Sequence, residues 1–197
     1  MILALIIVAS YLLGAIPFGL VLGRLAGVDV RAQGSGNIGA TNVARTAGKS
    51  LGLLTLLLDA LKGALPPLIV RYGLADALGP AGPDLAVYAG LAAVVGHIFP
   101  IYLKLRGGKG VATAAGMFAA IAPLELGVGL VVFGAAYALS KVVSVGSLLG
   151  ALALLLALVF GPASFVTAAA GGVVVGLIFV RHTGNIQRIL AGRENRL

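Results

Sequence analysis

The chain has 197 residues, of which 60% are hydrophobic and only 10% are charged, and its mean hydropathy is +1.11. Soluble domains carry about 25% charged residues and about 45–50% apolar ones, so we exclude a water-soluble globular protein and expect lipid around much of the chain. The formal net charge is +8, and in a membrane protein such cations lie at the bilayer surface, where anionic substrates or lipid headgroups are expected partners and nucleic acid is not.

Apolar stretches that could cross a bilayer, which takes about 20 helical residues, follow one another along the chain. In chain order they are 2–23, about 51–70, about 85–103, two short spans within 110–140, and two within 142–180. No cationic stretch precedes the first span, so we expect it to be retained and not cleaved as a signal peptide. We divide 110–140 at Pro123, with one long kinked helix as the alternative, and place a turn at Gly161–Pro162. The sequence therefore predicts an all-α, polytopic integral membrane protein with seven transmembrane helices.

The distribution of charge favours seven spans over six. With seven spans, every lysine and arginine except Lys62 and Arg71 falls on one side of the membrane, which is the positive-inside pattern. With six spans, Lys141 and the C-terminal arginines would face the opposite side from the first two basic loops. We therefore expect the N-terminus outside and the C-terminus in the cytoplasm. We find no internal repeat and no linker, so we expect a single domain over residues 1–197.

The first polar segment on the cytoplasmic side is 34–45. Its glycines let the backbone approach a ligand closely, so that consecutive N–H groups can form an anion-binding concavity. Arg45 can donate two parallel hydrogen bonds to a phosphate. The alternative is a flexible loop with topology-setting charge, because a lone glycine loop is a weak signal. The candidate binding residues are Gly34, Ser35, Gly36, Asn37, Gly39, Thr41 and Asn42.

The second polar segment, 96–113, ends in a glycine turn directly before the fourth expected span. The turn consists of Gly107, Gly108, Lys109 and Gly110. A glycine turn at a helix N-terminus is a plausible phosphate seat, although the P-loop spacing is missing. Lys104 and Arg106 could equally be topology-setting charges. His97 lies in an apolar stretch, where a histidine more often bonds a backbone carbonyl near a helix end, so we rank it below the loop residues.

The third polar segment, 181–195, follows the last span. His182 and Asn185 are three residues apart and would share one face of a helix, with Arg188 a further three along. The alternative is a basic tail that anchors the span. Glu194 is a lone acid among arginines, so we expect it to have a structural pairing role. Ser147 and Ser144 follow Lys141 on the same side of the membrane, and either could reach a pocket there.

Two charged residues fall inside the second span. Asp59 and Lys62 are three residues apart, and each would be costly in hydrocarbon if unpaired. We expect them to pair or to face a polar interior. A functional pair and a buried bridge that only fixes helix packing are equally consistent with this spacing.

The three segments contain almost no carboxylates, and none of the six acids of the chain forms an adjacent pair. Metal sites in phosphate chemistry generally use Asp or Glu, so we expect no metal and no cofactor. The absence of cysteine excludes thiolate sites, and a G-x-S-x-G nucleophile elbow is missing. Tyr102 follows His97, and Gln187 follows His182, where soluble-type glycerolipid acyltransferases have an aspartate five residues after the histidine. The residues suit phosphate dianions and an oxyanion held by N–H donors and cations.

The three segments, in order, resemble the three motifs of the acyl-phosphate-dependent glycerol-3-phosphate acyltransferase family. Segment 34–45 resembles GSGNxGAxNxxR, segment 96–113 resembles GHxFPxxLxxxGGKGxAT, and 182–194 resembles HxxNIxRLxxGxE with Ile189 in place of leucine. The resemblance implies transfer of a fatty acyl group from acyl phosphate to the sn-1 hydroxyl of glycerol 3-phosphate, giving lysophosphatidate and inorganic phosphate. It implies the first committed step of phospholipid synthesis at the cytoplasmic side of a bacterial inner membrane. No obligate protein partner is implied.

The resemblance also implies roles for individual residues. The catalytic group would be Ser35, Arg45, Lys109, His182 and Asn185. The substrate-binding group would be Gly34, Gly36, Asn37, Gly39, Asn42, Gly107, Gly108, Gly110 and Ser147. Within these groups, the resemblance implies that Arg45 and Lys109 clamp phosphate and that a phosphate-holding loop is shaped by Ser35, Gly36, Asn37, Gly39 and Asn42. We expect direct transfer without an acyl-enzyme, and the proton of the acceptor could go to His182 or to a substrate phosphate.

Two other functions are compatible with basic loops in a membrane protein. A carrier for organic phosphates would use the same residues, but transporter sites generally lie near the midplane, and these residues lie at one membrane face. A scaffold that binds anionic lipids would need only the cations. It would leave Asn37, Asn42, His182 and Asn185 unexplained.

Overall fold

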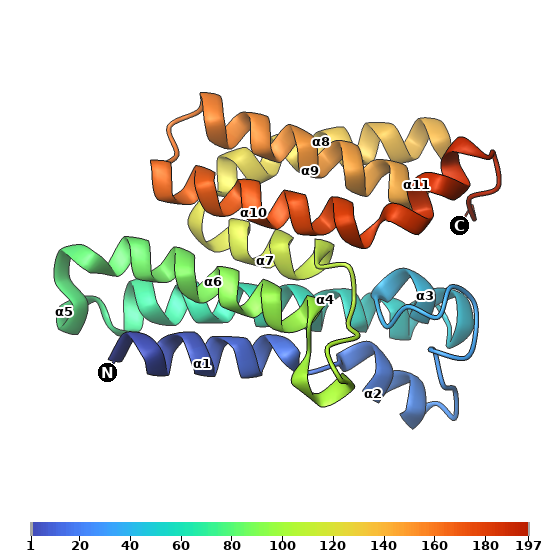
Figure 1. Ribbon diagram of the computed structural model, residues 1–197, viewed down its shortest axis with the longest axis horizontal. Helices are drawn as coiled ribbons and strands as arrows, with labels where there is room; N and C mark the ends of the chain where they lie inside the picture. Colours follow the sequence, from blue (N-terminus) through green and yellow to red (C-terminus); the bar gives the residue numbers. More distant parts are fainter. Residues whose placement is uncertain (1, 197) are drawn as a thin grey trace. The chain divides into compact units, whose positions relative to one another are not determined.

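The structure, a computed structural model, describes residues 2–196, and these are all helical or irregular (Figure 1). Contacts between residues divide the chain into two compact units, residues 1–120 and residues 121–197. The expected single domain over the whole chain therefore stays a prediction, and each unit is described by itself.

The first unit contains the longer run of elements. They are α1 (Ile2–Ala15), α2 (Phe18–Leu25), α3 (Ala40–Thr46), α4 (Lys49–Leu68), the π turn η1 (Ile69–Gly73), α5 (Ala75–Leu78), the 3-10 turn η2 (Gly79–Ala81), α6 (Gly82–Ile98), the 3-10 turn η3 (Ile101–Leu103) and α7 (Val111–Ile121), which ends at the boundary of the unit. The second unit contains α8 (Pro123–Ser140), α9 (Val143–Phe160), α10 (Phe165–Arg181) and α11 (Thr183–Leu190).

Prolines set the main helix breaks. Pro17 separates α1 from α2, because proline lacks the N–H that continues a helix. Ala122 leaves the helical region before Pro123, with φ −147° and ψ 63°, since a residue before proline is disfavoured there. The predicted division at Pro123 is thus confirmed. The turn at Gly161–Pro162 is confirmed too, and α10 begins after it with the Ser164 hydroxyl accepting from the Thr167 N–H.

Among the described residues, five helical segments are long and apolar enough to cross a membrane, or six if α10 and α11, bent by 57°, count as one. The fourth expected span is α7, which has 11 residues. At about 1.5 Å per residue it is roughly 16 Å long, about half of a hydrocarbon core of about 30 Å. The structure confirms a polytopic all-helical membrane protein but not the count of seven spans.

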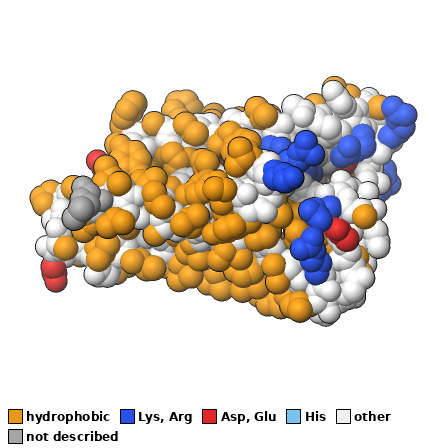
Figure 2. All heavy atoms as spheres, turned by 60° about the horizontal axis from the view of Figure 1, so that its bottom comes forward, with side chains coloured by type: hydrophobic (Ala, Val, Ile, Leu, Met, Phe, Trp, Pro, Cys, Tyr) orange, Lys and Arg blue, Asp and Glu red, His pale blue; other side chains and the backbone are white. Residues whose placement is uncertain are grey.

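On α4 of the first unit, large apolar side chains lie outside and charged ones lie inside. Leu53, Leu57 and Leu61 on α4 are exposed, whereas Asp59 and Lys62 on the same helix are buried. Hydrophobic side chains cover much of the face seen in Figure 2. A surface of this kind suits a bilayer, where exposed leucine meets lipid tails and not water.

Helices in the first unit approach closely at glycines. A Cβ on Gly63 of α4 would collide with the carbonyl of Thr113 on α7, and one on Gly116 of α7 would collide with the carbonyl of Ala60. Arg71, in η1 beyond the end of α4, donates to the carbonyl of Ala120 at 3.3 Å, near the end of α7. Small residues at helix contacts are the usual means of packing in a membrane, because burial of apolar surface gives little driving force there.

In the second unit, α8 packs against α9 and α9 against α10. Gly150 of α9 lies against the carbonyl of Gly129 and the Phe133 side chain of α8. Gly171 of α10 lies against Leu158 of α9. Glycines therefore allow close helix packing within the second unit, as they do within the first.

Candidate functional site

The loop of residues 30–39 in the first unit is organised by the buried side chain of Asn42. The Asn42 Oδ1 accepts from the Ser35 N–H at 2.8 Å. Its Nδ2 donates to the carbonyls of Val30 at 2.8 Å, Gln33 at 3.1 Å and Asn37 at 2.9 Å. The side-chain amide of this one residue on α3 thus forms hydrogen bonds with backbone groups along the loop.

Glycines give this loop its backbone course. Gly34 and Gly36 have φ of 59° and 69°, in the left-handed region that favours glycine. A Cβ on Gly34 would collide with Asn42 Oδ1. The Asn37 Oδ1 accepts from the Gly39 N–H at 2.8 Å at the start of α3. Asn37 and Asn42 therefore engage their side chains within the loop, as expected of residues that shape it.

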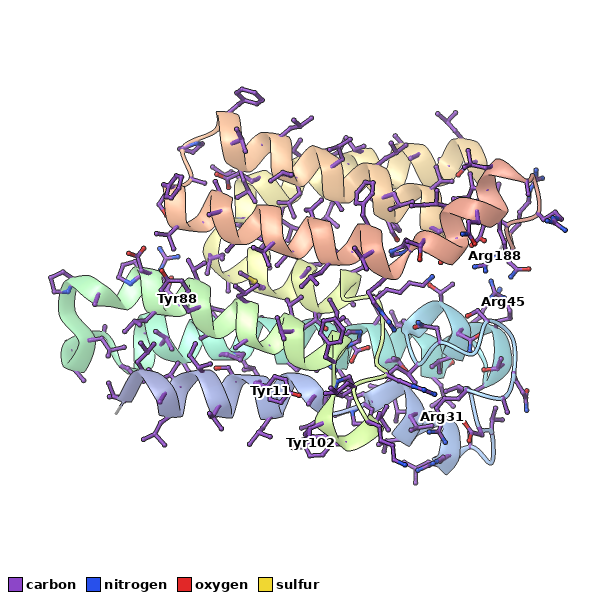
Figure 3. All side chains as sticks on the ribbon, viewed as in Figure 1. Tyr11, Arg31, Arg45, Tyr88, Tyr102 and Arg188 are labelled. Atoms are coloured by element: carbon purple, nitrogen blue, oxygen red, sulfur yellow. The ribbon has the colours of Figure 1, made fainter. Side chains whose placement is uncertain are left out.

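Ser35 and Arg45 present their side chains to the outside of this segment. Both are exposed, and Arg45 lies in the last turn of α3, where Figure 3 labels it. Beneath them, a small core fixes the loop and α3 to α2; its buried members are Leu20, Val30, Ile38 and Val43. The segment thus offers a hydroxyl and a guanidinium on a rigid base.

A neighbouring arginine is already neutralised. The Nη2 of Arg31 lies 3.0 Å from Asp29 Oδ2, and the Arg31 backbone N–H and Nε donate to Asp29 Oδ1. The side-chain and backbone hydrogen bonds from Arg31 lower the pKa of Asp29 to about 2, and the pair raises the pKa of Arg31. Arg45 is therefore the better candidate for a phosphate.

The second glycine loop folds back onto the end of α6. The Gly107 N–H donates to the carbonyl of Ile98 and the Gly108 N–H to the carbonyl of His97, both at 3.1 Å. A Cβ on Gly107 would collide with the His97 carbonyl, and one on Gly108 with the edge of the His97 ring. These glycines were expected to offer their N–H groups to a ligand. In the structure they let the loop that carries Lys109 lie directly on His97.

The last glycine of this loop, Gly110, has a φ of 86° and precedes α7, whose Ala114 N–H donates to the Gly110 carbonyl at 2.8 Å. Lys109 is half-buried beside it. The predicted position of the lysine at the entrance to a helix is therefore confirmed.

His97 joins the intramembrane pair, which sequence reasoning missed. Lys62 Nζ lies 2.9 Å from Asp59 Oδ1, so the predicted pairing is confirmed. His97 Nδ1 lies 3.6 Å from the same oxygen. Because α4 and α6 are far apart in the sequence, no local spacing signals this contact.

In the second unit, His182 lies between α10 and α11 and is buried. Its Nδ1 is 2.8 Å from the carbonyl of Ile178. A carbonyl only accepts, so Nδ1 carries a hydrogen and the lone pair of the neutral ring is on Nε2. This tautomer is the one in which Nε2 could accept a proton.

Glu194 is the centre of the third polar segment. Its carboxylate accepts from Ser144 Oγ at 3.0 Å, from Arg188 Nε at 2.6 Å and from Asn185 Nδ2. Burial would raise the pKa of Glu194, but the hydrogen bonds from Asn185, Arg188 and Ser144 outweigh it and hold the pKa below its ordinary value. The predicted structural pairing of Glu194 is confirmed.

These contacts show where two of the predicted site residues are engaged, and their roles in catalysis and binding stay predictions. Asn185 faces Glu194, so it closes the C-terminal segment onto α11. The Ser147 hydroxyl donates to the Val143 carbonyl of its own helix at 2.9 Å, and it is Ser144 that reaches the C-terminal segment. The contact of Asn185 with Glu194 was not evident from residue spacing, whereas Ser144 was one of the two serines considered.

The predicted site residues divide between the two units. The first unit contains the two glycine loops with Ser35, Arg45 and Lys109. The second contains His182, Asn185 and Ser147. Within residues 2–196 no group of three or more His, Cys, Asp or Glu could hold a metal ion. The chemistry that these side chains can perform is binding of anions and proton transfer at a histidine.

Known proteins are similar to this chain in sequence and in fold. The family model described as glycerol-3-phosphate acyltransferase matches residues 4–192. A glycerol-3-phosphate acyltransferase of Anaeromyxobacter dehalogenans (strain 2CP-1) is 49% identical, with 98% of this chain and 96% of the relative covered. One of Desulfotalea psychrophila is 47% identical, with 94% and 93% covered. The crystal structure of PlsY, an integral membrane glycerol 3-phosphate acyltransferase, in its glycerol 3-phosphate form, has a TM-score of 0.92 at 37% identity, covering 100% of this chain and 96% of that one.

Proposed function

The chain belongs to the glycerol-3-phosphate acyltransferase family, and on that premise we propose that it transfers a fatty acyl group from acyl phosphate to the sn-1 hydroxyl of glycerol 3-phosphate. The products are lysophosphatidate and inorganic phosphate, and the reaction is the first committed step of phospholipid synthesis. The PlsY structures, described as a glycerol 3-phosphate form and a lysophosphatidic acid form, correspond to the acceptor and the product of this reaction.

The observation that carries the choice of donor is the character of the polar segments. They hold Arg45, Lys109 and glycine loops, while their carboxylate, Glu194, is occupied by Asn185 and Arg188. Such a site has cations for two phosphates, but its carboxylate is engaged and does not assist a base in deprotonating the acceptor hydroxyl, so the donor itself must be well activated. Acyl phosphate is a mixed anhydride with phosphate as an easily displaced leaving group, so it needs the least activation.

The proposed reaction is a direct transfer. The acceptor oxygen forms a bond to the acyl carbon, the bond from that carbon to the phosphate oxygen breaks, and its electron pair leaves with the phosphate. The hydroxyl proton goes to His182 Nε2, a role supported by the Nδ1 contact with Ile178, and from there to phosphate. Arg45 and Lys109 bind phosphate oxygens, and Ser35 donates to an oxygen of the reacting groups.

Other residues shape the site in this proposal. Asn37 and Asn42 hold the first loop, Gly107 and Gly108 hold the second, and Asn185 with Glu194 fixes α11. We place the protein in a bacterial inner membrane as one domain with seven helices, α7 being a short one. The N-terminus is outside, and the C-terminus and active site are in the cytoplasm, as the distribution of lysine and arginine favours.

The experiment that tests the function measures phosphate release from palmitoyl phosphate by detergent-purified protein, with and without glycerol 3-phosphate. We expect release that requires glycerol 3-phosphate, yields lysophosphatidate, survives EDTA and falls sharply in Arg45→Ala. Acceptor-independent hydrolysis, or no release from folded protein, would overturn the proposal. Glycerol 3-phosphate flux into proteoliposomes without loss of acyl phosphate would point to a carrier instead.

A further inference from the structure

A buried polar cluster in the first unit has no part in the proposed chemistry. Asp59 and Lys62 lie on α4 and His97 lies at the end of α6, and each side chain is at most 4% exposed. Ionisable groups at such depth in a membrane protein are costly unless they pair. The contacts of the three residues show what they hold in place.

The Asp59 carboxylate is shared by two partners. Its Oδ1 lies 2.9 Å from Lys62 Nζ and 3.6 Å from His97 Nδ1. Lys62 is thus within ion-pairing distance of the carboxylate, and the His97 ring faces the same oxygen from just beyond hydrogen-bond distance. Removal of this one carboxylate would therefore release both side chains.

The lysine connects the cluster to the first glycine loop. Lys62 Nζ donates to the Ile16 carbonyl at 2.7 Å, at the break between α1 and α2, and lies 5.6 Å from the centroid of the Phe18 ring. Gly19 follows, and a Cβ there would collide with the carbonyl of Ile38, inside the 34–45 segment. Lys62 thus fixes the start of α2, and α2 supports the loop that leads to Arg45.

The histidine connects the cluster to the second glycine loop. The His97 carbonyl accepts from the Gly108 N–H at 3.1 Å, and the His97 ring lies against Gly108 so closely that a Cβ there would collide with it. Lys109 is the next residue. The orientation of the His97 ring, set by Asp59, therefore sets the position of the loop that carries Lys109.

We propose that Asp59 is a positioning residue, which holds the two glycine loops of the first unit at the spacing that phosphate binding requires. It touches no substrate and acts through Lys62 and His97. This inference rests on the proposed function, because the phosphates are those of its substrates. Misplacement of a binding group by about 1 Å can cost about 100-fold in rate, so a small shift of either loop has a measurable effect.

Two double variants test the histidine connection without leaving a lone buried charge. Asp59→Asn with Lys62→Met and Asp59→Leu with Lys62→Met both remove the ion pair at nearly constant volume. They differ in whether position 59 offers an oxygen to His97. We expect similar melting temperatures, and a KM for glycerol 3-phosphate at least about tenfold higher in the Leu variant than in the Asn variant. Equal kinetic constants in the two variants would overturn the proposal.

A second variant covers the case in which the Leu variant does not fold. His97→Gln keeps the Asp59–Lys62 pair but removes the ring beneath Gly108, so it should raise KM to a similar extent. A wild-type KM in this variant overturns the proposal. As a control, Gly150→Ala in the second unit presses a Cβ against the Gly129 carbonyl and should lower the melting temperature with no change in KM.

Stabilisation by glycerol 3-phosphate separates this inference from the proposed reaction. We measure the rise in melting temperature that glycerol 3-phosphate causes in the wild type and in the double variants, with no acyl donor present. If the wild type does not turn over palmitoyl phosphate, yet the rise is present in the wild type and the Asn variant and lost in the Leu variant, the proposed function fails and the positioning role stands. A wild-type protein that glycerol 3-phosphate does not stabilise overturns the positioning role as well.

Discussion

Asn42 offers the most direct test of how the first glycine loop is built. Its amide has two hydrogens and an accepting oxygen, and it is buried among Ser35, Val30, Gln33 and Asn37. Replacement by alanine removes all four contacts at once, and because the three carbonyls share two hydrogens, the four contacts amount to about three full hydrogen bonds. At a net value of about 1 kcal/mol for each, the loop should lose about 3 kcal/mol of local stability.

Hydrogen exchange of residues 30–39 in detergent micelles measures this loss. Since about 1.36 kcal/mol corresponds to tenfold, the protected amides of the loop should exchange roughly a hundredfold faster in Asn42→Ala. Asn42→Asp should behave like alanine, because it keeps an acceptor for Ser35 but turns the donor into an oxygen that faces three carbonyls. Gln33→Ala is the matched control, since only the backbone carbonyl of Gln33 takes part.

The comparison between Asn42→Ala and Asn42→Asp tests whether the amide donor of Asn42 organises the loop. Wild-type exchange in Asn42→Asp would refute the inference that the amide donor organises the loop. Faster exchange in Gln33→Ala would show that any change in the loop opens it, and would remove the support that Asn42→Ala gives.

Three further outcomes follow from the site. Because the pKa of Glu194 is lowered in the folded protein, its carboxylate stabilises the fold fully above the ordinary pKa of 4.5, and this stabilisation is lost as the pH falls below that value. The melting temperature of Glu194→Gln should therefore lack this loss at acid pH. A pH profile like that of the wild type would contradict the stabilising role of the carboxylate. Gly108→Ala should raise the KM for glycerol 3-phosphate about tenfold, because the added Cβ displaces the loop from His97. Gly127→Ala is the control, since its Cβ meets open space and should leave the KM unchanged. Equal KM values in the two variants would argue against loop displacement. Arg45→Ala should lower kcat/KM about 10- to 100-fold and Arg45→Lys less, because lysine keeps the charge but not the paired hydrogen bonds; equal losses would contradict a two-pronged contact.

Sequence reasoning succeeded where structure depends on local chemistry. The breaks at Pro123 and at Gly161–Pro162 were predictable, because proline removes a hydrogen-bond donor and restricts the preceding residue. The pairing of Asp59 with Lys62 was predictable as well, since residues three apart on a helix are neighbours and a lone charge is costly in lipid.

The length of α7 was not predictable from hydropathy. The apolar composition of 110–121 says that a helix there avoids water, but not whether lipid or neighbouring helices surround it. In the structure, Thr113, Gly116 and Met117 are buried against α4 and α6 of the same unit. An apolar stretch enclosed in this way need not match the thickness of a bilayer.

The roles of individual site residues were the hardest part to predict. The loop-shaping role of Asn42 followed from the family resemblance and not from its residue type, and the sequence did not indicate which backbone groups its side chain contacts. Gly108 could equally have been a glycine that admits a ligand or one that admits a histidine ring. His97 and Asp59 lie on separate helices, and only the fold brings them together.

The close contact of α4 with α7 limits how this sequence can change over time. At Gly63 and Gly116 each helix lies against the other's backbone, so even one added methyl group has nowhere to go. In water, a larger apolar side chain could recover some of that strain by leaving solvent, but lipid offers no such compensation. Substitutions should therefore accumulate on the leucines that face the bilayer and be purged at these glycines. In related chains, the residues at the α4–α7 contact should thus diverge more slowly than those on the outer surface of the first unit.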